Sequence, residues 1–442
     1  MRRLLPVLAL LAALLAPSAP AQAATSDVEW HRYHYDVAHS GYSATTPAPG
    51  SLKKAWSVKL DGQVYASPLV AEHIVVVATE NNSLFGFTRA GKLLWSHHDY
   101  ASVPLNQLPC GNIDPLGITG TPVYDLGTHR VYAVTTTKSG STLRHWLIGV
   151  GVQTGHVETR RSVDVPGQSM LYENQRGALS ITRGRVLVTY GGHAGDCGPY
   201  HGYLLEVPIA GGAITTYKVG RGTEAGMWQP SGPTVGPDTS VYVVSGNGSE
   251  FSGSWDGGNA VHRVSPVTAQ RYSYYAPADW AQGNRDDADL GSSGATLIGS
   301  KVWIQGKTST GYLLDKTNLG GVGHPLATVD NACAKQFGGS AVHGSVAYLP
   351  CTDGIRKITV SGSTVTLGWK ASSSITGSPV VGGGVVWTID PSGGVLYALN
   401  ESDGAVRTSL NVGTMTRFMS PALSGSLALV GTTTGIVAVA NA

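Results

Sequence analysis

Short apolar runs separated by turn residues recur along this chain. Each copy opens with a small residue, then Ser, Thr or Gly, then Pro or Ala and an apolar pair. A Gly-containing turn, an apolar strand and a polar turn follow. The copy that reads most cleanly is 377–399, GSPVVGGGVVWTIDPSGGVLYAL. Its β-branched runs predict strands at Ser378–Val381, Val385–Ile389 and Val395–Asn400, with a fourth at Thr408–Val412.

Eight such copies can be recognised, and eight groups of four antiparallel strands predict an all-β, eight-bladed β-propeller. A β-solenoid would need shorter and more uniform repeats, and a β-sandwich would not repeat eight times. The copies start at Ala66–Leu69, Gly120–Val123, Arg176–Leu179, Ser231–Thr234, Ser293–Thr296, Gly339–Val342, Gly377–Val380 and Met419–Ala422.

The last copy ends at Val439, shortly after its third strand. We expect Lys54–Leu60, which precedes the first copy, to supply the missing outer strand. Such pairing of the first and last segments would close the ring and remove two exposed sheet edges.

Tryptophan residues recur in the predicted outer strands. Gly91–Trp95 fits a Gly-x-x-x-Trp pattern, and Trp56 and Trp369 end their outer strands in a similar way. Large aromatic side chains contribute strongly to packing. These residues are therefore expected to cover the seams between neighbouring blades, where glycine allows close approach.

Charge and composition exclude some classes of protein. The chain of 442 residues has 30 Lys and Arg against 28 Asp and Glu, and only 13% of its residues are charged. This balance lacks the basic surface of a nucleic-acid-binding protein, so no nucleic-acid partner is expected. The 59 glycines favour many short strands and tight turns over helices.

The N-terminus has the pattern of an export signal. Arg2 and Arg3 precede the apolar stretch Leu4–Ala16, and Ala21–Ala23 is a small-x-small cleavage site. We therefore expect a signal peptide at 1–23 and a single propeller domain at 24–442, secreted to the extracellular side. No cysteine follows the signal for a lipid anchor, and no later run is long enough for a membrane span.

Four cysteines, Cys110, Cys197, Cys333 and Cys351, indicate two disulfides in an exported chain, with three possible pairings. In a four-stranded blade, the loop before the first strand and the loop between the second and third strands lie on one face. All four cysteines fall in such loops. Their positions favour the pairs 110–197 and 333–351. The Gly-rich segment 191–202 is then read as a disulfide-pinned loop, since its His, Asp and Cys spacing fits no zinc motif.

The same rule gathers polar residues on this face. From loops before first strands come Glu173, Arg176, Trp228, Asp287 and Asp289, and from loops between second and third strands come Asn247 and Lys307. Ordinary structural roles are also open to them: the aspartates can close a loop by side-chain hydrogen bonds, and Asn247–Gly248 is a normal turn pair.

The repeat resembles the pyrroloquinoline-quinone (PQQ) repeat of quinoprotein dehydrogenases and of the propeller that helps assemble outer-membrane proteins. The resemblance runs from about Trp30 to the end and implies a quinoprotein alcohol dehydrogenase-like fold. Three stretches resemble the enzymes further: Val243–Gly248, Asp286–Gly291, and Gln305–Lys307 followed by Gly311–Asp315.

The resemblance implies roles for these positions. Asn247, with Asp287 or Asp289, would ligate Ca²⁺, and one of the aspartates would be the catalytic base. Lys307 would contact the quinone. Glu173 is the nearest candidate for a further metal ligand, Trp228 could stack under a flat ring, and Arg176 is a further cofactor-binding candidate. The vicinal cysteine pair of the methanol-type enzymes is absent.

Three functions follow as hypotheses. The first is a binding module that holds a small molecule or a protein on its disulfide-bearing face, with no cofactor. The second is a PQQ- and calcium-dependent alcohol or sugar dehydrogenase. The third is a scaffold for envelope assembly, against which the lack of a lipid anchor counts. Whether the chain is an enzyme stays open at this stage.

Overall fold

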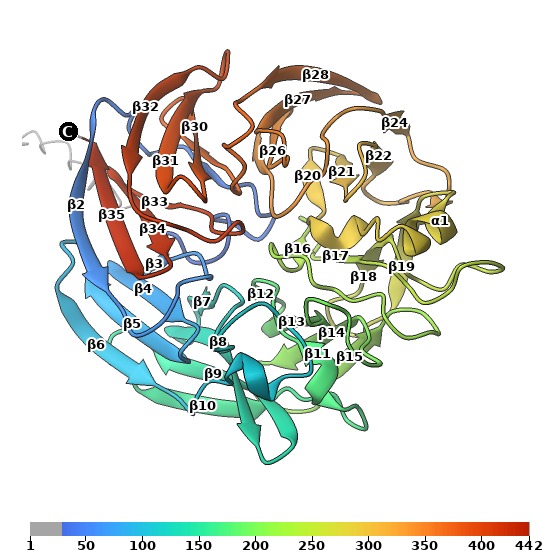
Figure 1. Ribbon diagram of the computed structural model, residues 1–442, viewed down its shortest axis with the longest axis horizontal. Coiled ribbons are helices and arrows are strands. Elements are labelled where there is room, and N and C mark those ends of the chain that lie inside the picture. The colour runs from blue at the N-terminus through green and yellow to red at the C-terminus, as the bar shows by residue number, and fades with distance from the viewer. Residues whose placement is uncertain (1–28, 442) are drawn as a thin grey trace, which may run out of the picture.

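The chain folds into a ring of small β-sheets. The computed structural model describes residues 29–441, which form eight sheets arranged radially about a central axis (Figure 1). Within each blade, neighbouring strands pair antiparallel, and the first strand lies nearest the axis. The predicted eight-bladed propeller is therefore confirmed. The predicted signal peptide lies outside the described residues.

Each blade takes its first three strands in chain order, and the fourth lies at the rim. Blades 1 to 4 are β3 (Leu69–Ala71), β4 (Ile74–Thr79), β5 (Ser83–Thr88), β6 (Leu93–His98); β7 (Val123–Asp125), β8 (Arg130–Ser139), β9 (Thr142–Gly151), β10 (Val157–Ser162); β12 (Ser180–Thr182), β13 (Arg185–Gly192), β14 (Tyr203–Pro208), β15 (Thr215–Lys218); and β16 (Thr234–Val235), β17 (Val241–Ser245), β18 (Ala260–Val264), β19 (Arg271–Ala276). Blades 5 to 8 are β20 (Thr296–Ile298), β21 (Lys301–Gln305), β22 (Gly311–Asp315), β24 (Ala327–Val329); β25 (Ala341–His343), β26 (Val346–Leu349), β27 (Arg356–Ser361), β28 (Thr364–Lys370); β29 (Val380–Gly382), β30 (Val385–Asp390), β31 (Val395–Asn400), β32 (Val406–Asn411); and β33 (Ala422–Ser424), β34 (Leu427–Thr432), β35 (Gly435–Asn441), β2 (Leu52–Lys59).

A few short elements lie outside this scheme. They are β1 (Tyr42–Ser43), β11 (Glu173–Asn174), β23 (Gly321–Val322), α1 (Trp280–Arg285) and the 3-10 turns η1 (Leu105–Gln107), η2 (Met170–Tyr172) and η3 (Leu290–Ser292). The helix α1 and the turn η3 flank the acidic loop of blade 5, so they position Asp287 and Asp289.

The ring is closed by both ends of the chain. Strand β2, from the N-terminal part, pairs antiparallel with β35, the last strand, from Leu52 opposite Asn441 to Lys59 opposite Gly435. The predicted closure is confirmed. Because the blade 8 sheet draws on both ends, β35 is paired on both sides, and β2 forms the outer edge of the sheet as the fourth strands of the other blades do.

The predicted tryptophans cover three seams between blades. At each seam the indole ring lies against a turn glycine of the next blade, and the indole N–H donates to a backbone carbonyl beside that glycine. A Cβ atom on the glycine would fall within 2.4–2.7 Å of the ring. The sets are Trp56 with Gly91 and the Arg89 carbonyl, Trp95 with Gly155 and the Val152 carbonyl, and Trp369 with Gly404 and the Glu401 carbonyl.

Trp95→Ala should lower the free energy of unfolding by about 3–5 kcal/mol, because it empties the seam and removes the bond to the Val152 carbonyl. Denaturant unfolding measures the loss. Leu94→Ala is the matched control, since this neighbouring side chain is 48% exposed. Equal effects of the two variants would contradict the packing role.

A segment near the N-terminus, residues 29–43, ties the blades together at the axis. We call it the axial strap. Trp30 exchanges two backbone hydrogen bonds with Val70 of β3, at 2.8 and 2.9 Å. Other strap carbonyls accept from Tyr124, Val235, Val342 and Val381, and His39 and His34 bond to Ser180 and Ser420. Contacts with the inner strands or their preceding loops thus reach blades 1, 2, 3, 4, 6, 7 and 8. The sequence repeat predicts no strand in this segment.

Both predicted disulfides are confirmed. Cys110 pairs with Cys197, with 6.0 Å between Cα atoms, and Cys333 pairs with Cys351, at 5.4 Å. The first bond joins loops of blades 2 and 3, and the second lies within the loops of blade 6. In the part of the chain that the structure describes, no helix has both the length and the apolar character to cross a bilayer.

Candidate functional site

An ion-paired cluster lies where the loops of blades 4 and 5 meet. Lys307, just beyond β21, places its Nζ 2.7 Å from Asp287 Oδ1 and 2.7 Å from Asp289 Oδ2. Asn247, just beyond β17, donates its backbone N–H to Asp289 Oδ1 at 2.7 Å and its Nδ2 to Asp287 Oδ1 at 2.9 Å. Four of the predicted site residues are therefore brought into direct contact.

The two aspartates differ in their surroundings. The Asp289 side chain is 10% exposed, whereas that of Asp287 is 67% exposed. Burial raises the pKa of Asp289, against the attraction of Lys307 and the hydrogen bonds that it accepts. Burial alone would lower the pKa of Lys307, but the two carboxylates raise it, so the ammonium group stays charged. Lys307 and Asp289 therefore form a largely buried ion pair beneath the loops of blades 4 and 5.

Side-chain amides hold Asn247 and the acidic loop in place by hydrogen bonds. Asn259 donates to Asn247 Oδ1 at 3.0 Å and to Asn284 Oδ1 at 2.8 Å, and its own Oδ1 accepts from the backbone N–H of Leu290. Sequence reasoning missed Asn259 and Asn284. Asn259 carries a weak signal, because it directly precedes a strand in a Gly-Gly-Asn turn and adopts a φ of 48°.

Trp228 also reaches this cluster. The Lys307 Nζ lies 5.8 Å from the centre of its ring, and the ring is followed toward the axis by Phe337, 6.4 Å away, and Phe418, 6.3 Å from Phe337. Arg417 lies over Phe337 and Arg176 lies over Phe418, at 5.1 and 4.2 Å. We call Trp228, Phe337, Phe418, Arg176 and Arg417 the axial patch.

Arg176 and Glu173 contact other groups than the Lys307 cluster. The Arg176 guanidinium finds no hydrogen-bond acceptor among the described residues. Burial lowers its pKa to about 10, and the nearby Glu80 opposes this shift. Glu173 lies in β11, where its Oε1 accepts the backbone N–H of His201 at 3.0 Å. Burial raises the pKa of Glu173 to about 8. The metal and cofactor roles of both residues stay predictions.

Residues 43–251 match the family model described as outer membrane protein assembly factor BamB. The repeat structure described above extends over the rest of the ring. The matched part of the chain therefore resembles the PQQ-like β-propeller repeat.

This PQQ-like propeller is similar to solved structures of two quinohemoprotein alcohol dehydrogenases and of BamB. Quinohemoprotein alcohol dehydrogenase from Comamonas testosteroni is 15% identical, with a TM-score of 0.72 over 95% of this chain and 81% of the other. The enzyme ADHIIG from Pseudomonas putida HK5 is 11% identical, with a TM-score of 0.74 over 94% and 80%. BamB from Moraxella catarrhalis is 15% identical, with a TM-score of 0.59 over 88% and 100%. At these identities the likeness establishes the fold alone. No curated protein matches the sequence.

The residues of this PQQ-like propeller do not fit a calcium–quinone pair as they are arranged. The oxygens expected to bind the metal are already engaged, since Lys307 bonds both aspartates and Asn259 bonds Asn247 Oδ1. Within residues 29–441, no group of three His, Cys, Asp or Glu is placed to hold a metal ion.

The axis itself is also filled. The cavity beside Arg176 measures about 10 Å³, enough for one water, and Tyr33 of the axial strap forms part of its wall. A tricyclic quinone would need the strap or the axial patch to move. We therefore derive no step through PQQ.

Proposed function

We propose that this chain is an exported binding protein whose disulfide-bearing face takes an anionic ligand at the axial patch. The observation that carries the proposal is the position of the Lys307 ammonium, 2.7 Å from both carboxylates. A cation in this position offsets one of the two carboxylate charges and keeps the oxygen ligands of a dehydrogenase site engaged. Two disulfides suit a protein that works in an oxidising compartment.

The axial patch supports an anionic ligand. Arginine and large aromatic side chains are the groups that contribute most at binding surfaces. Trp228, Phe337 and Phe418 are half-buried, and Arg417 is exposed. Arg176, half-buried and without a hydrogen-bonded acceptor, offers a guanidinium fork for a carboxylate. We propose a ligand that places a carboxylate on Arg176 and a single flat ring on the outer side of the axial patch, because the cavity beneath has room for about one water.

The dehydrogenase is the second candidate, favoured by the juxtaposition of Asn247, Asp287, Asp289 and Lys307. It would require Lys307 to release the aspartates when calcium and quinone bind. The scaffold hypothesis draws its support from the match of 43–251 to the outer-membrane assembly family model.

Calorimetry with simple aromatic carboxylates, and with PQQ in the presence and absence of CaCl₂, separates these functions. We expect binding of an aromatic carboxylate that calcium does not change, and no dye reduction with a panel of alcohols and sugars. Arg176→Gln should weaken this binding about tenfold or more, since hydrogen bonds to charged groups contribute about 1.5–3 kcal/mol. Arg160→Gln is the matched control, because Arg160 pairs with Asp99 at the rim.

Two results would overturn the proposal. Calcium-dependent PQQ binding with dye reduction, lost in Asp289→Asn, would establish the dehydrogenase. The absence of heat with every carboxylate at saturating concentration would remove the anionic ligand from the axial patch.

A further inference from the structure

The seam between blades 2 and 3 lacks the tryptophan that covers three other seams of this ring. In blade 1, Trp95 follows a β-bulge in the outer strand and faces Gly86. In blade 2, the residue with the same register is Thr159, which follows the same kind of bulge and faces Gly149. The seam between blades 2 and 3 therefore has a short hydroxyl side chain where the previous seam has an indole.

The glycine that would receive this ring is present and uncovered. Gly211 occupies the turn after the third strand of blade 3, as Gly155 does in blade 2, and has a φ of 89°. A Cβ on Gly211 would meet nothing within 4 Å, whereas one on Gly155 would lie 2.7 Å from Trp95. The turn has kept its shape without the ring that packs on it elsewhere.

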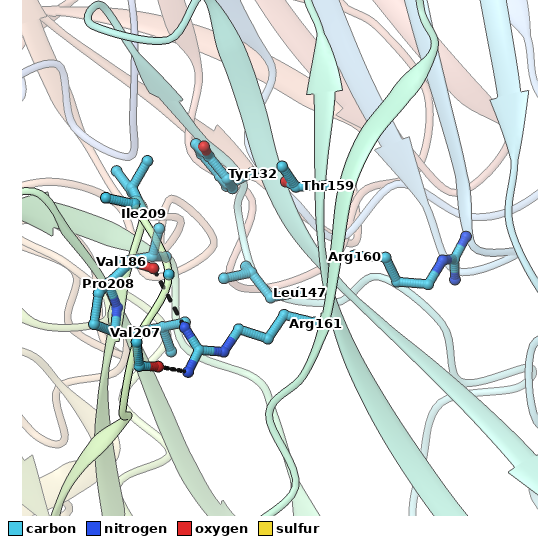
Figure 2. Close-up of a pocket in the computed structure, with 12 residues that line it drawn as sticks. Tyr132, Leu147, Thr159, Arg160, Arg161, Val186, Val207, Pro208 and Ile209 are labelled. Atoms are coloured by element: carbon cyan, nitrogen blue, oxygen red, sulfur yellow. Dashed lines mark hydrogen bonds between the residues drawn. The ribbon is translucent and has the colours of Figure 1, made fainter.

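An open groove of about 460 Å³ lies at this seam (Figure 2). Its volume is within the ordinary range for ligand sites. Tyr132, Leu147, Val186 and Val207 line it, and all four are buried. The Tyr132 ring gives the groove one flat wall.

Two arginines border the groove. Arg161 reaches across and bonds the carbonyls of Pro208, at 3.3 Å, and Gly212. Arg160 points away from the groove (Figure 2) and pairs with Asp99. Arg161 keeps its positive charge, and a guanidinium stacks well on the face of an aromatic ring, which favours a planar aromatic occupant.

The groove also has the matching acceptor. At two of the covered seams, the carbonyls of Val152 and Glu401 accept the indole N–H. The backbone N–H groups of the same residues donate to the carbonyls of His129 and Gly384, which lie in the turn between the first two strands of each blade. Ile209 makes the same backbone bond, to Gly184 at 3.0 Å. No described group donates to the Ile209 carbonyl, so this acceptor is free for a ligand.

We propose that the groove between blades 2 and 3 binds a planar aromatic ring with one N–H donor, of the indole class. The ring would lie over the Gly211 turn, against Tyr132, and donate to the Ile209 carbonyl. Its chemistry is set by the three seams that the chain fills with its own indoles. The same ring could come from a free small molecule or from a tryptophan of a partner polypeptide. This rim site is separate from the axial patch, so the two proposals stand or fall independently.

Titration with indole and with N-acetyl-L-tryptophanamide, followed by calorimetry and ligand-observed NMR, tests the site. Binding of either probe supports the proposal, and the tighter probe identifies the source as a free ring or a peptide side chain. Thr159→Trp should abolish binding of both, because the chain then fills its own groove. The same variant should raise Tm by about 1–3 °C, as other cavity-filling substitutions do.

Thr159→Val is the matched control, because it keeps the groove open at the same position and should bind as the unchanged protein does. Far-UV circular dichroism verifies that both variants are folded. If Thr159→Trp fails to fold, Ile209→Pro, which alters the turn that carries the acceptor, replaces it. Binding that persists in a folded Thr159→Trp variant, or no binding of either probe at millimolar concentration, would overturn the proposal.

Discussion

Deletion of the axial strap, residues 29–43, is expected to abolish cooperative folding of the ring. The strap satisfies backbone donors of inner strands in several blades, and an unsatisfied buried N–H costs about 1–3 kcal/mol. The deletion also removes Trp30 and Tyr33, whose side chains are 0% and 1% exposed. The sum exceeds the total stability of about 5–15 kcal/mol that is typical of a folded protein. Near-UV circular dichroism and thermal unfolding measure the outcome.

Two single substitutions test the contribution of the strap to stability without deleting it. Trp30→Ala should lower the free energy of unfolding by about 3–5 kcal/mol, because its ring is buried against the first blade. Tyr35→Ala, in the same segment but 36% exposed, should have a much smaller effect. A strap-deleted protein that melts cooperatively at the temperature of the unchanged chain would show that the ring does not depend on this segment.

Acid should unfold the protein over a narrow range below pH 6.5. Burial lowers the pKa of His34 and His262 to about 3, and that of His145 and His193 to about 4. In the unfolded chain these groups titrate near 6.5, so the unfolded state binds more protons as the pH falls. Their contribution to stability is complete above pH 6.5 and is lost as the pH falls to about 4 for His145 and His193 and to about 3 for His34 and His262. Each group contributes a slope of about 1.4 kcal/mol per pH unit in this range.

Buried glutamates act in the opposite direction. Burial raises the pKa of Glu80 to about 7 and that of Glu173 to about 8. The folded protein therefore holds protons that the unfolded chain releases above about pH 4.3, and this contribution to stability weakens as the pH rises toward 8. Among residues 29–441, six histidines have lowered pKa values, whereas four glutamates and Asp289 have raised ones, so the net slope between pH 5 and 6.5 should follow the histidines.

Urea unfolding between pH 4 and pH 8 measures this balance. His145→Phe should flatten the acid slope, because both nitrogens of His145 are buried without a described hydrogen-bond partner and the ring packs edge-on against Tyr190. His156→Phe, at an exposed position, is the control. An unchanged acid slope in a folded His145→Phe variant would contradict the assignment.

The parts of the fold that repeat were predictable from sequence, because each copy carries its own strand and turn signals. The blade count, the closure by β2, the seam tryptophans and both disulfides follow from such local rules and from the face on which each loop lies. The axial strap occurs once, so no periodicity marks it. Its role depends on carbonyls that meet distant strands, which the sequence pattern does not encode.

The candidate site was predictable only in part, for a geometric reason. Topology states on which face of the ring a loop lies, but not its distance from other loops on that face. It therefore grouped Glu173 and Arg176 with Asn247 and Lys307, although no described contact joins these two pairs. The bonds from Lys307 to both aspartates depend on side-chain rotamers and on the Asn259 amide network, which spacing along the chain does not reveal.

The joining of β2 to β35 has a consequence for proteolysis. A single cut at an exposed turn, such as residues 210–212, would divide the chain into two fragments whose distant ends remain hydrogen-bonded in one sheet. The axial strap would in addition hold strands of the second fragment, from Val235 to Ser420, to the first. Such a nicked ring should migrate as one particle on a sizing column and as two bands after denaturation.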